Sequence, residues 1–385
     1  MNLAGADADI VDAAMIEDLR ERFPRVAVVH EWLTIPGGSE QVVLELLKMF
    51  PQAEIFTSIY DPSPWPAQIT GRPVHTSFLN RIPGAVRHYP KLLPLMDRAF
   101  RSFDLSAFDL VLSSNHACAK NVHVPSGALH VCYCHTPMRY AWEEDFLRGE
   151  EVGPVARMLL PWLLRHLRRR DLAGASSPDV FVANSRHVAA RVERYYGRDA
   201  EVVHPPVDVE HFLELPRAAR DYYLVFGRVV PYKRVDLAVA ACERLGRRLK
   251  VAGGGRALDS LRSIAVENTE FLGSVSDDER DALLIGARAL LFPGEEDFGI
   301  VPVEAQAAGV PVLAYGVGGA AESVLDGRTG VLFDEQSPAG MAAAIERYEQ
   351  LQLSGEQARE NARRFGRARF RQEMAEVIER AAPTR

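Results

Sequence analysis

Two acidic residues separated by seven positions occupy the carboxyl half of the chain. Glu296 and Glu304 lie within the run FPGEEDFGIVPVEAQAAG. Pro302 suits the first turn of a short helix and Gly309 its end, so we expect Glu304 at the helix start and Glu296 in the preceding loop. A carboxylate accepts paired hydrogen bonds from neighbouring hydroxyls. The spacing indicates a site for a ribose and a second sugar, and a carboxylate that stabilises a helix amino terminus is the alternative for Glu304.

A second group of residues combines cations with a glycine. In the run FGRVVPYKRVDLAV, Gly227 and Arg228 end a predicted strand and Lys233 starts the following helix. Arginine is a planar bidentate donor and lysine a compact point charge, so together they can hold a diphosphate and stabilise the charge that develops as it departs. A solvated basic turn is the alternative.

Glycines also follow two other predicted strands. Gly37 and Gly38 precede a helix, where they would let a phosphate approach backbone N–H groups. A simple tight turn is the alternative for this pair. The glycines from Gly253 to Gly255 resemble part of a dinucleotide-binding fingerprint and raise the alternative of a dehydrogenase, but the full spacing is missing, which favours a tight strand-to-helix turn over an NAD site.

These residues follow strands that alternate with helix-length segments, a pattern typical of parallel sheets covered by helices. The first series of β-branched runs comprises residues 26–29, 54–59, 110–114, 129–134 and 180–184. The second comprises residues 222–226, 249–253, 269–273, 289–292 and 310–315.

Prolines at positions 205, 206 and 216 discourage both helix and central strand, and they place a boundary between the two series. We predict an α/β protein with two Rossmann-like parallel-sheet domains that face each other across a cleft. The predicted divisions are an amino-terminal domain at 1–204, a carboxyl-terminal domain at 205–365 and a helix at 366–385 that packs back on the first domain.

The composition excludes several classes of protein. The 385 residues include 45 Lys and Arg against 52 Asp and Glu, and the net charge of −7 argues against a nucleic-acid binder. Four cysteines are too few for a disulfide framework. Because the amino terminus is acidic and no apolar run reaches about 18 residues, we expect neither a signal peptide nor a membrane span, and a cytoplasmic location.

The sequence resembles the retaining family-4 glycosyltransferases of the GT-B fold over about residues 25–380. The resemblance rests on Glu296 and Glu304, on the segment from Gly227 to Lys233, on the Gly37-Gly38 pair and on the run YCHTPMRYAW. Within that family, the run HTPMRYAW resembles the sequences of mannosyltransferases that build bacterial O-antigen and exopolysaccharide from GDP-mannose.

The resemblance implies a role for each matching position. Arg228 and Lys233 would hold the donor diphosphate, Glu304 the ribose hydroxyls and Glu296 the donor sugar. The catalytic positions it implies are His135, beside the transferred sugar, with Arg228, Lys233 and Glu296. The donor-binding positions it implies are Gly37, Gly38, Arg228, Lys233, Glu296, Phe298, Gly299, Ile300 and Glu304. We expect no cofactor and no metal, because the two cations supply the positive charge that a metal would bring.

The acceptor side is predicted from residues 157–170, RMLLPWLLRHLRRR, which mix arginines with large apolar side chains. A basic amphipathic helix can lie on an anionic membrane, where a lipid-linked acceptor would be found. The expected acceptor is therefore lipid-linked or an oligosaccharide, and the expected location is peripheral at the inner face of the membrane. A partly buried domain helix with solvated arginines is the alternative.

Other functions remain open at this point. The donor could carry UDP or dTDP in place of GDP. An epimerase or hydrolase would act on the same nucleotide sugar without an acceptor. A non-catalytic protein that only binds nucleotide sugars is the alternative from a different class.

Overall fold

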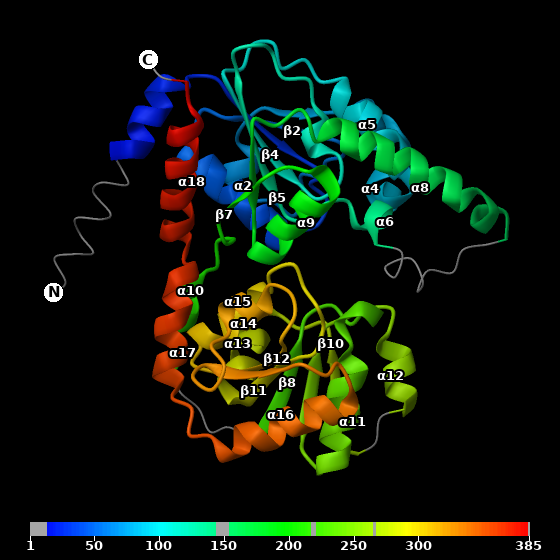
Figure 1. Cartoon of the computed structure of the whole chain (residues 1–385), viewed down its shortest axis with the longest axis vertical. Coiled ribbons are helices and arrows are strands. Elements are labelled where there is room, and N and C mark those ends of the chain that lie inside the picture. Colours follow the sequence, from blue (N-terminus) through cyan, green and yellow to red (C-terminus); the bar gives the residue numbers. More distant parts are fainter. Residues whose placement is uncertain (1–13, 144–153, 217–220, 265–266, 384–385) are drawn as a thin grey trace. The chain divides into compact units, whose positions relative to one another are not determined.

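The structure is a computed structural model that describes residues 14–143, 154–216, 221–264 and 267–383. The chain divides into two compact units, Met1–Pro206 with Ala368–Arg385, and Val207–Arg367. Their boundaries lie two residues beyond the predicted ones in both places. Each unit is an α/β structure built on its own sheet (Figure 1).

The first unit contains a seven-stranded parallel sheet with the order β3-β2-β1-β4-β5-β6-β7. Its strands are β1 (Val26–His30), β2 (Glu54–Thr57), β3 (Val74–Thr76), β4 (Leu110–Asn115), β5 (Leu129–Cys134), β6 (Val180–Ala183) and β7 (Glu201–Val202). The central strands are fully buried, as near-continuous apolar runs require. The edge strands β3 and β7 are short and largely exposed, which is why the hydrophobic pattern missed them.

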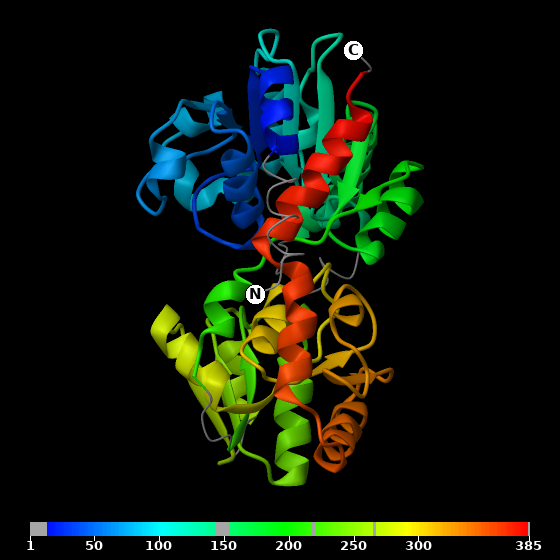
Figure 2. The same ribbon diagram turned by 90° about the vertical axis from the view of Figure 1, so that its left-hand side faces the viewer.

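Helices cover both faces of this sheet. They and the 3-10 turns are α2 (Gly38–Met49), α3 (Ala67–Thr70), η1 (Phe78–Arg81), α4 (Ala85–His88), η2 (Tyr89–Leu92), α5 (Leu93–Arg101), η3 (Ala119–Asn121), α6 (Arg139–Trp142), α8 (Pro154–Gly174), α9 (Arg186–Tyr196) and α18 (Arg367–Ala381). Figure 2 shows α18, the red helix at the end of the chain, lying against the first unit. Its residues Phe370, Met374 and Ile378 are buried in one core cluster with residues of β1 and α2. The final helix is thereby part of the first unit.

The second unit contains a six-stranded parallel sheet with the order β10-β9-β8-β11-β12-β13. Its strands are β8 (Tyr222–Phe226), β9 (Leu249–Ala252), β10 (Thr269–Gly273), β11 (Ala287–Phe292), β12 (Val312–Tyr315) and β13 (Gly330–Phe333). Its helices and 3-10 turns are α10 (Val209–Leu213), η4 (Pro231–Lys233), α11 (Val235–Leu245), α12 (Leu258–Ile264), α13 (Asp277–Gly286), α14 (Ile300–Ala307), α15 (Ala320–Ser323), α16 (Pro338–Gln350), α17 (Gly355–Ala362) and η5 (Arg363–Phe365). Two apolar clusters pack on the sheet.

Both sheets reverse their strand order at one point. In the first unit the reversal falls between β1 and β4, and in the second between β8 and β11. Loops on the two sides of such a point diverge and leave a crevice at the carboxyl ends of the strands, where ligands of open α/β sheets bind. The predicted fold class of two parallel-sheet α/β domains is confirmed.

Candidate functional site

Lys233 and Glu296 meet at the reversal point of the second sheet. Lys233 ends η4, which follows β8, and Glu296 follows β11, the neighbouring strand. Lys233 Nζ lies 2.8 Å from Glu296 Oε1, and the two side chains are 17% and 20% exposed. A mostly buried cation and carboxylate therefore lie where the topology places a ligand. Lys233 was expected at the start of a helix, but α11 begins two residues later.

Close backbone approach around Lys233 explains the glycines nearby. A Cβ atom on Gly294 would lie 2.7 Å from Lys233 Cα, and one on Gly253 would lie 1.9 Å from the carbonyl oxygen of Gly227. Gly253 also has a φ of 134°, a conformation that other residues rarely adopt. The glycines from Gly253 to Gly255 thus form a tight turn against the loop after β8, in agreement with the favoured interpretation.

Gly319 supports the loop that carries Glu296, and this glycine was not predicted from the sequence. The backbone N–H of Gly319 donates to the carbonyl of Glu296 at 2.8 Å. A Cβ on Gly319 would lie 2.2 Å from Phe298 Cα, so only glycine fits there. The Phe298 ring itself is 3% exposed and packs 5.6 Å from the Phe365 ring. Phe298 therefore anchors the loop, and only its backbone is available to a ligand.

Gly299 and Ile300 form the turn into α14. Gly299 has a φ of 88° at the amino cap, and Ile300 is the first helical residue. The backbone N–H groups of a first helical turn lack partners within the helix and suit an anion.

Glu304 lies in the second turn of α14, so its expected position at the helix start was wrong. The side chain is half-buried, and burial raises its pKa to about 7. The charge of Arg280 acts in the opposite direction, whereas Asp281, Asp208 and Asp277 raise the pKa further. Glu304 consequently titrates near neutral pH, which is unusual for a carboxylate.

Arg228 is exposed after β8, and its Nη2 donates to the hydroxyl of Tyr232 at 3.3 Å. It lines the same small pocket as Lys233 and Glu296. The structure thus brings three of the sequence-predicted residues together. All of the predicted residues from Arg228 onward lie in the second unit, and Gly37, Gly38 and His135 lie in the first.

In the first unit, His135 follows β5 beside the reversal point. Its backbone N–H donates to the carbonyl of Asn115 at 2.8 Å, and its carbonyl accepts from Asn184 Nδ2 at 2.9 Å. Burial lowers the pKa of His135 well below its usual value, and the charges of His116 and His30 add to this. His135 is therefore a neutral imidazole held by its backbone on both sides.

Gly37 and Gly38 are exposed, with Gly37 at the amino cap of α2. The first turn of this helix also carries Glu40, whose Oε1 lies 3.0 Å from His30 Nε2. Both of these side chains are buried, and neither was singled out from the sequence. The signal that points to them is a polar residue at the carboxyl end of an apolar strand and an acidic residue in the first turn of the next helix.

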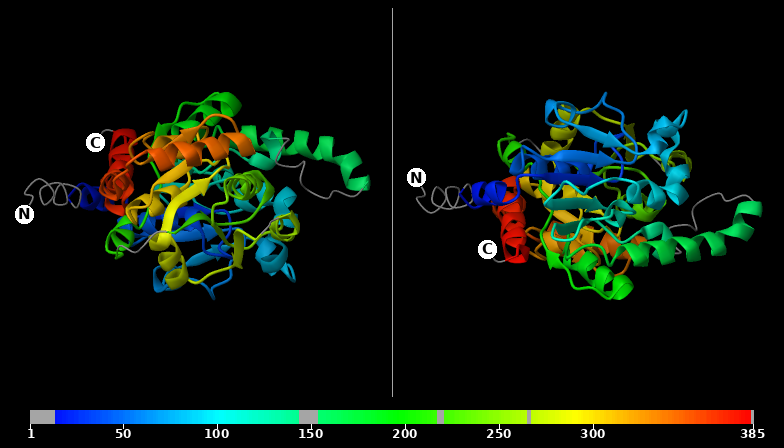
Figure 3. Two further views of the ribbon diagram at one scale, coloured as in Figure 1. Left: turned by 90° about the horizontal axis from the view of Figure 1, so that it is seen from below. Right: turned by 90° about the horizontal axis from the view of Figure 1, so that it is seen from above.

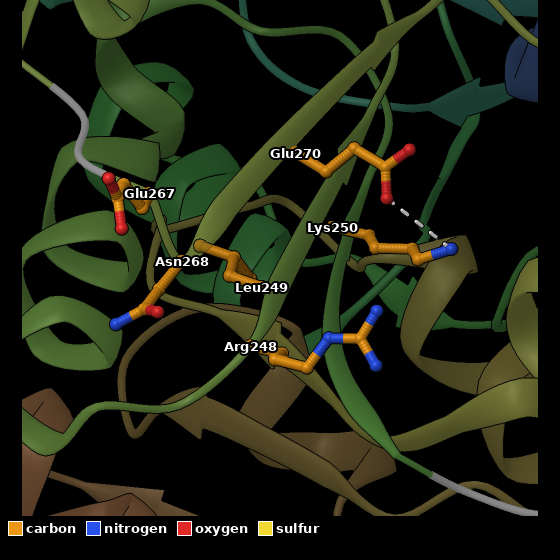
Figure 4. Close-up of a pocket in the computed structure, with 6 residues that line it drawn as sticks. All are labelled: Arg248, Leu249, Lys250, Glu267, Asn268 and Glu270. Atoms are coloured by element: carbon orange, nitrogen blue, oxygen red, sulfur yellow. Dashed lines mark ion pairs between the residues drawn. The ribbon is translucent and has the colours of Figure 1, made fainter.

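A further pocket of about 310 Å³ lies at the other end of the second sheet. Six residues line it: Arg248, Leu249, Lys250, Glu267, Asn268 and Glu270 (Figure 4). They belong to the amino ends of β9 and β10 and the residues before them. Lys250 Nζ lies 3.5 Å from Glu270 Oε2 there. This pocket is separate from the Lys233 site. Its pair of Lys250 and Glu270 is a lysine–glutamate ion pair of the same kind as Lys233 with Glu296, but it lies outside the candidate site.

The part of the chain that the structure describes holds neither a metal-binding cluster nor a helix that could cross a membrane. In the described ranges, no group of three or more His, Cys, Asp or Glu side chains is arranged to hold a metal ion. Within those same ranges, no helix has the length and apolar character that a membrane crossing requires.

The family described as Glycosyltransferase Family 4 matches residues 36–211, and the one described as Glycosyl transferases group 1 matches residues 209–365. The chain belongs to the family-4 glycosyltransferases. The crystal structure of Anabaena HepE in complex with UDP and glucose is similar to this chain, with a TM-score of 0.65, 18% identity and coverage of 92% of this chain and 99% of that one. At this identity the likeness shows the fold.

Two curated relatives are similar over part of their length. A D-inositol 3-phosphate glycosyltransferase of Streptomyces bingchenggensis is 31% identical over 257 residues, covering 57% of this chain and 54% of the relative. A GDP-mannose-dependent alpha-(1-6)-phosphatidylinositol monomannoside mannosyltransferase of Mycolicibacterium smegmatis is 31% identical over 232 residues, covering 51% and 58%. The match thus spans little more than half the length of these relatives.

Proposed function

We propose that the protein transfers a hexosyl group from a nucleoside-diphosphate sugar to an acceptor hydroxyl, with retention at the anomeric carbon. The observation that carries this proposal is the pairing of Lys233 with Glu296 at the β8/β11 reversal point, with Arg228 beside it. A cation for a diphosphate and a carboxylate for sugar hydroxyls are thereby adjacent. Membership of the glycosyltransferase family supports the same function.

The two cations stabilise the departing diphosphate. Charge develops on the leaving phosphate in the transition state, and Lys233 and Arg228 are the positive groups at that place. Without a donor, Lys233 is neutralised by Glu296. On donor binding the diphosphate takes the contact with Lys233, and Glu296 turns to the hydroxyls of the sugar. Because these cations supply the positive charge, the reaction proceeds without a metal.

Retention is proposed to follow a front-face substitution. The bond between the anomeric carbon and the leaving phosphate oxygen breaks while the acceptor oxygen attacks from the same face. The leaving phosphate takes the proton of the acceptor hydroxyl. No enzymic nucleophile is needed in this scheme, and His135 contributes a hydrogen bond to the transferred sugar.

The donor is proposed to be GDP-mannose. The support is the run HTPMRYAW and the likeness to a relative whose name specifies GDP-mannose. Glu304 would then accept hydrogen bonds from the two ribose hydroxyls. A uridine nucleotide is the second candidate, because HepE is described in complex with UDP and glucose.

The acceptor is proposed to be a lipid-linked sugar or an oligosaccharide, and the product to belong to a cell-surface polysaccharide. Helix α8 is proposed to bring the enzyme to the membrane surface where a lipid-linked acceptor lies. Figure 3 shows this helix projecting from the first unit. Met158 and Trp162 are 73% and 66% exposed on it, and Arg165, Arg169 and Arg170 are exposed as well. The prediction from residues 157–170 also used Arg157 and Leu159, whose side chains lie outside the part of the chain that the structure describes. Exposed apolar and basic side chains together suit an anionic lipid surface.

Replacement of the site lysine tests the proposal directly. Lys233→Ala is expected to lower kcat for sugar transfer by roughly a hundredfold or more, the scale for losing one charge contact to a transition state. Lys250→Ala is the matched control, because Lys250 also pairs with a glutamate in the same unit but at the other end of the sheet (Figure 4). The two variants are compared by chromatography of the nucleotide and sugar products, and the product anomer is read by NMR.

Four results would contradict the proposal. Near-normal turnover by Lys233→Ala would remove the lysine from the reaction. Inversion at the anomeric carbon would exclude retention. Release of free sugar with every acceptor tried would indicate a hydrolase, and binding without turnover would indicate a protein that only binds nucleotide sugars.

A further inference from the structure

Arg234 adopts a left-handed backbone conformation directly after the site lysine, Lys233. Among the residues that the structure describes, it is the only one other than glycine with a positive φ, at 52°. With its ψ of 38°, the Cβ atom of an L-residue lies too close to the following carbonyl oxygen. Glycine adopts this conformation freely, and asparagine, aspartate and histidine are enriched there among the other residues. An arginine in this conformation is therefore held by its surroundings.

Both backbone groups of Arg234 belong to hydrogen bonds of the neighbouring helical segments. Its N–H donates to the carbonyl of Pro231 at 3.1 Å and ends η4, whereas its carbonyl accepts from the N–H of Leu237 at 3.0 Å and begins α11. The valines that flank this corner of the chain, Val229 and Val235, are both buried. The corner at Arg234 is thereby fixed on both sides.

The side chain of Arg234 adds an ion pair to this corner. Its Nε lies 3.1 Å from Asp236 Oδ1, and its Nη2 lies 3.0 Å from Asp236 Oδ2, which is a bidentate arrangement. Asp236 lies in the first turn of α11, where a carboxylate is favourable. The two side chains are 35% and 43% exposed, and an exposed pair of this kind contributes little. The backbone contacts are therefore the main restraint on this corner.

The left-handed corner determines where Lys233 lies. A right-handed residue at position 234 would continue η4 into α11 as one helix, and Lys233 would then lie at the helix start, where the sequence predicts it. The corner instead makes Lys233 the last residue of η4, with its backbone against the loop that leads to Glu296. A Cβ atom on Gly294, in that loop, would lie 2.7 Å from Lys233 Cα. From this position Lys233 Nζ reaches Glu296 Oε1 at 2.8 Å.

We propose that Arg234 is a positioning residue whose left-handed backbone conformation places Lys233 against Glu296. Its effect on sugar transfer rests on the proposed function, whereas its effect on the position of Lys233 does not. A residue that accepts the left-handed conformation should keep Lys233 in place, and one that does not should displace it. Glycine and valine are the two extremes, because a β-branched residue almost never adopts a positive φ. Neither carries a guanidinium, so the comparison isolates the backbone.

Urea unfolding of Arg234→Gly and Arg234→Val tests the backbone conformation. The midpoint should be higher in Arg234→Gly than in Arg234→Val, because only glycine accepts the positive φ without strain. Arg262 in α12 is the matched control, because it is also an exposed arginine paired with a nearby aspartate, Asp259, but at an ordinary helical position. The order of the midpoints should be reversed at Arg262, since glycine is less favourable than valine inside a helix.

Carbodiimide cross-linking of the full chain reports the position of Lys233 without a donor. The reagent joins an amine to a carboxylate that it contacts, and mass spectrometry of the digest locates the bond. The wild type and Arg234→Gly should form the Lys233–Glu296 cross-link, and Arg234→Val should lose most of it. Lys250 and Glu270, whose Nζ and Oε2 atoms lie 3.5 Å apart outside the site, should cross-link equally in all three proteins.

The transfer assay shows what the position of Lys233 does for the reaction. We expect kcat to be on the order of tenfold higher in Arg234→Gly than in Arg234→Val, with a smaller difference in the KM for the donor, because displacing a reacting group by about 1 Å costs up to a hundredfold. Arg234→Ala should give intermediate values of the midpoint, the cross-link and kcat. It replaces Arg234→Val in all three comparisons if the valine variant does not fold.

Equal loss of the Lys233–Glu296 cross-link in Arg234→Gly and Arg234→Val would overturn the inference, because the guanidinium and not the backbone would then place the lysine. An intact cross-link in folded Arg234→Val would overturn it as well. So would the same order of midpoints at Arg234 and Arg262. Failure of the proposed function has a different signature. The wild type would then transfer sugar from no donor, while the midpoints and the cross-link still differ between the variants as expected.

Discussion

Protonation of Glu304 is expected to weaken donor binding as the pH falls through neutrality. Its pKa is about 7, because burial disfavours the charged form. Two ribose hydroxyls donate well to a carboxylate, whereas a protonated carboxyl group must use one oxygen as a donor. The carboxylate is about one-tenth ionised at pH 6 and about nine-tenths ionised at pH 8. The dissociation constant of the donor should therefore rise about tenfold between pH 8 and pH 6.

Calorimetry with GDP-mannose measures this change. The nucleotide sugar is preferable to free GDP, because its esterified diphosphate does not take up a proton near neutral pH. Glu304→Gln should bind more weakly at pH 8 and lose the pH dependence. Glu346→Gln, an exposed carboxylate on α16, serves as the control and should keep it. A wild-type affinity that stays constant between pH 6 and pH 8, or a tenfold change that persists in Glu304→Gln, would contradict this role of Glu304.

Glu304 also affects the stability of the fold, and here a rise in pH is unfavourable, whereas it favours donor binding. The folded pKa of about 7 lies above the ordinary value of 4.5, so the folded state binds more protons than the unfolded state between these values. The contribution of Glu304 to the free energy of unfolding is then lost as the pH rises through about 7. Without donor, Glu304→Gln should gain stability relative to the wild type at pH 8 but not at pH 4, measured by urea unfolding.

Three further predictions concern other parts of the chain. Gly319→Ala should weaken donor binding on the order of tenfold or more in calorimetry, because its Cβ would displace Phe298. Lys120→Met should lower the free energy of unfolding in urea by about 3–5 kcal/mol, because it leaves Asp171 buried without its cation; an unchanged midpoint would contradict this. Trp162→Ser should reduce sedimentation with vesicles that contain anionic lipid while leaving transfer to a soluble acceptor intact.

Much of the fold was predictable because its central strands are buried on both faces. Such strands are rich in apolar residues, and ten runs of this kind located ten of the strands, the edge strand β10 among them. Three strands were missed. Two of these, β3 and β7, are short exposed edge strands, and β13 begins with Gly330, whose Cβ would lie 1.9 Å from the Val312 carbonyl. Close approach between strands leaves no signal in hydrophobicity.

The candidate site was predicted where short local motifs carry it. Arg228 and Lys233 belong to the segment after β8, and Glu296 belongs to the segment after β11, so each motif could be read without knowledge of the fold. The hydrogen-bonding contacts that join His30 to Glu40 and Ser114 were not predicted, because they depend on the register that sets His30 opposite Ser114. That register is a property of the folded sheet, and 84 positions separate these two residues in the sequence.

The proposed function depends above all on the binding of a nucleoside-diphosphate sugar to Lys233 at the β8/β11 reversal point. The most direct measurement is calorimetry of GDP, UDP, dTDP and ADP and their hexose conjugates, with and without chelator, on the wild type and on Lys233→Ala. We expect preferential binding of GDP and GDP-mannose, insensitivity to chelator, and marked loss of affinity in Lys233→Ala. Equal binding by the wild type and Lys233→Ala, or no binding of any nucleotide sugar, would contradict it.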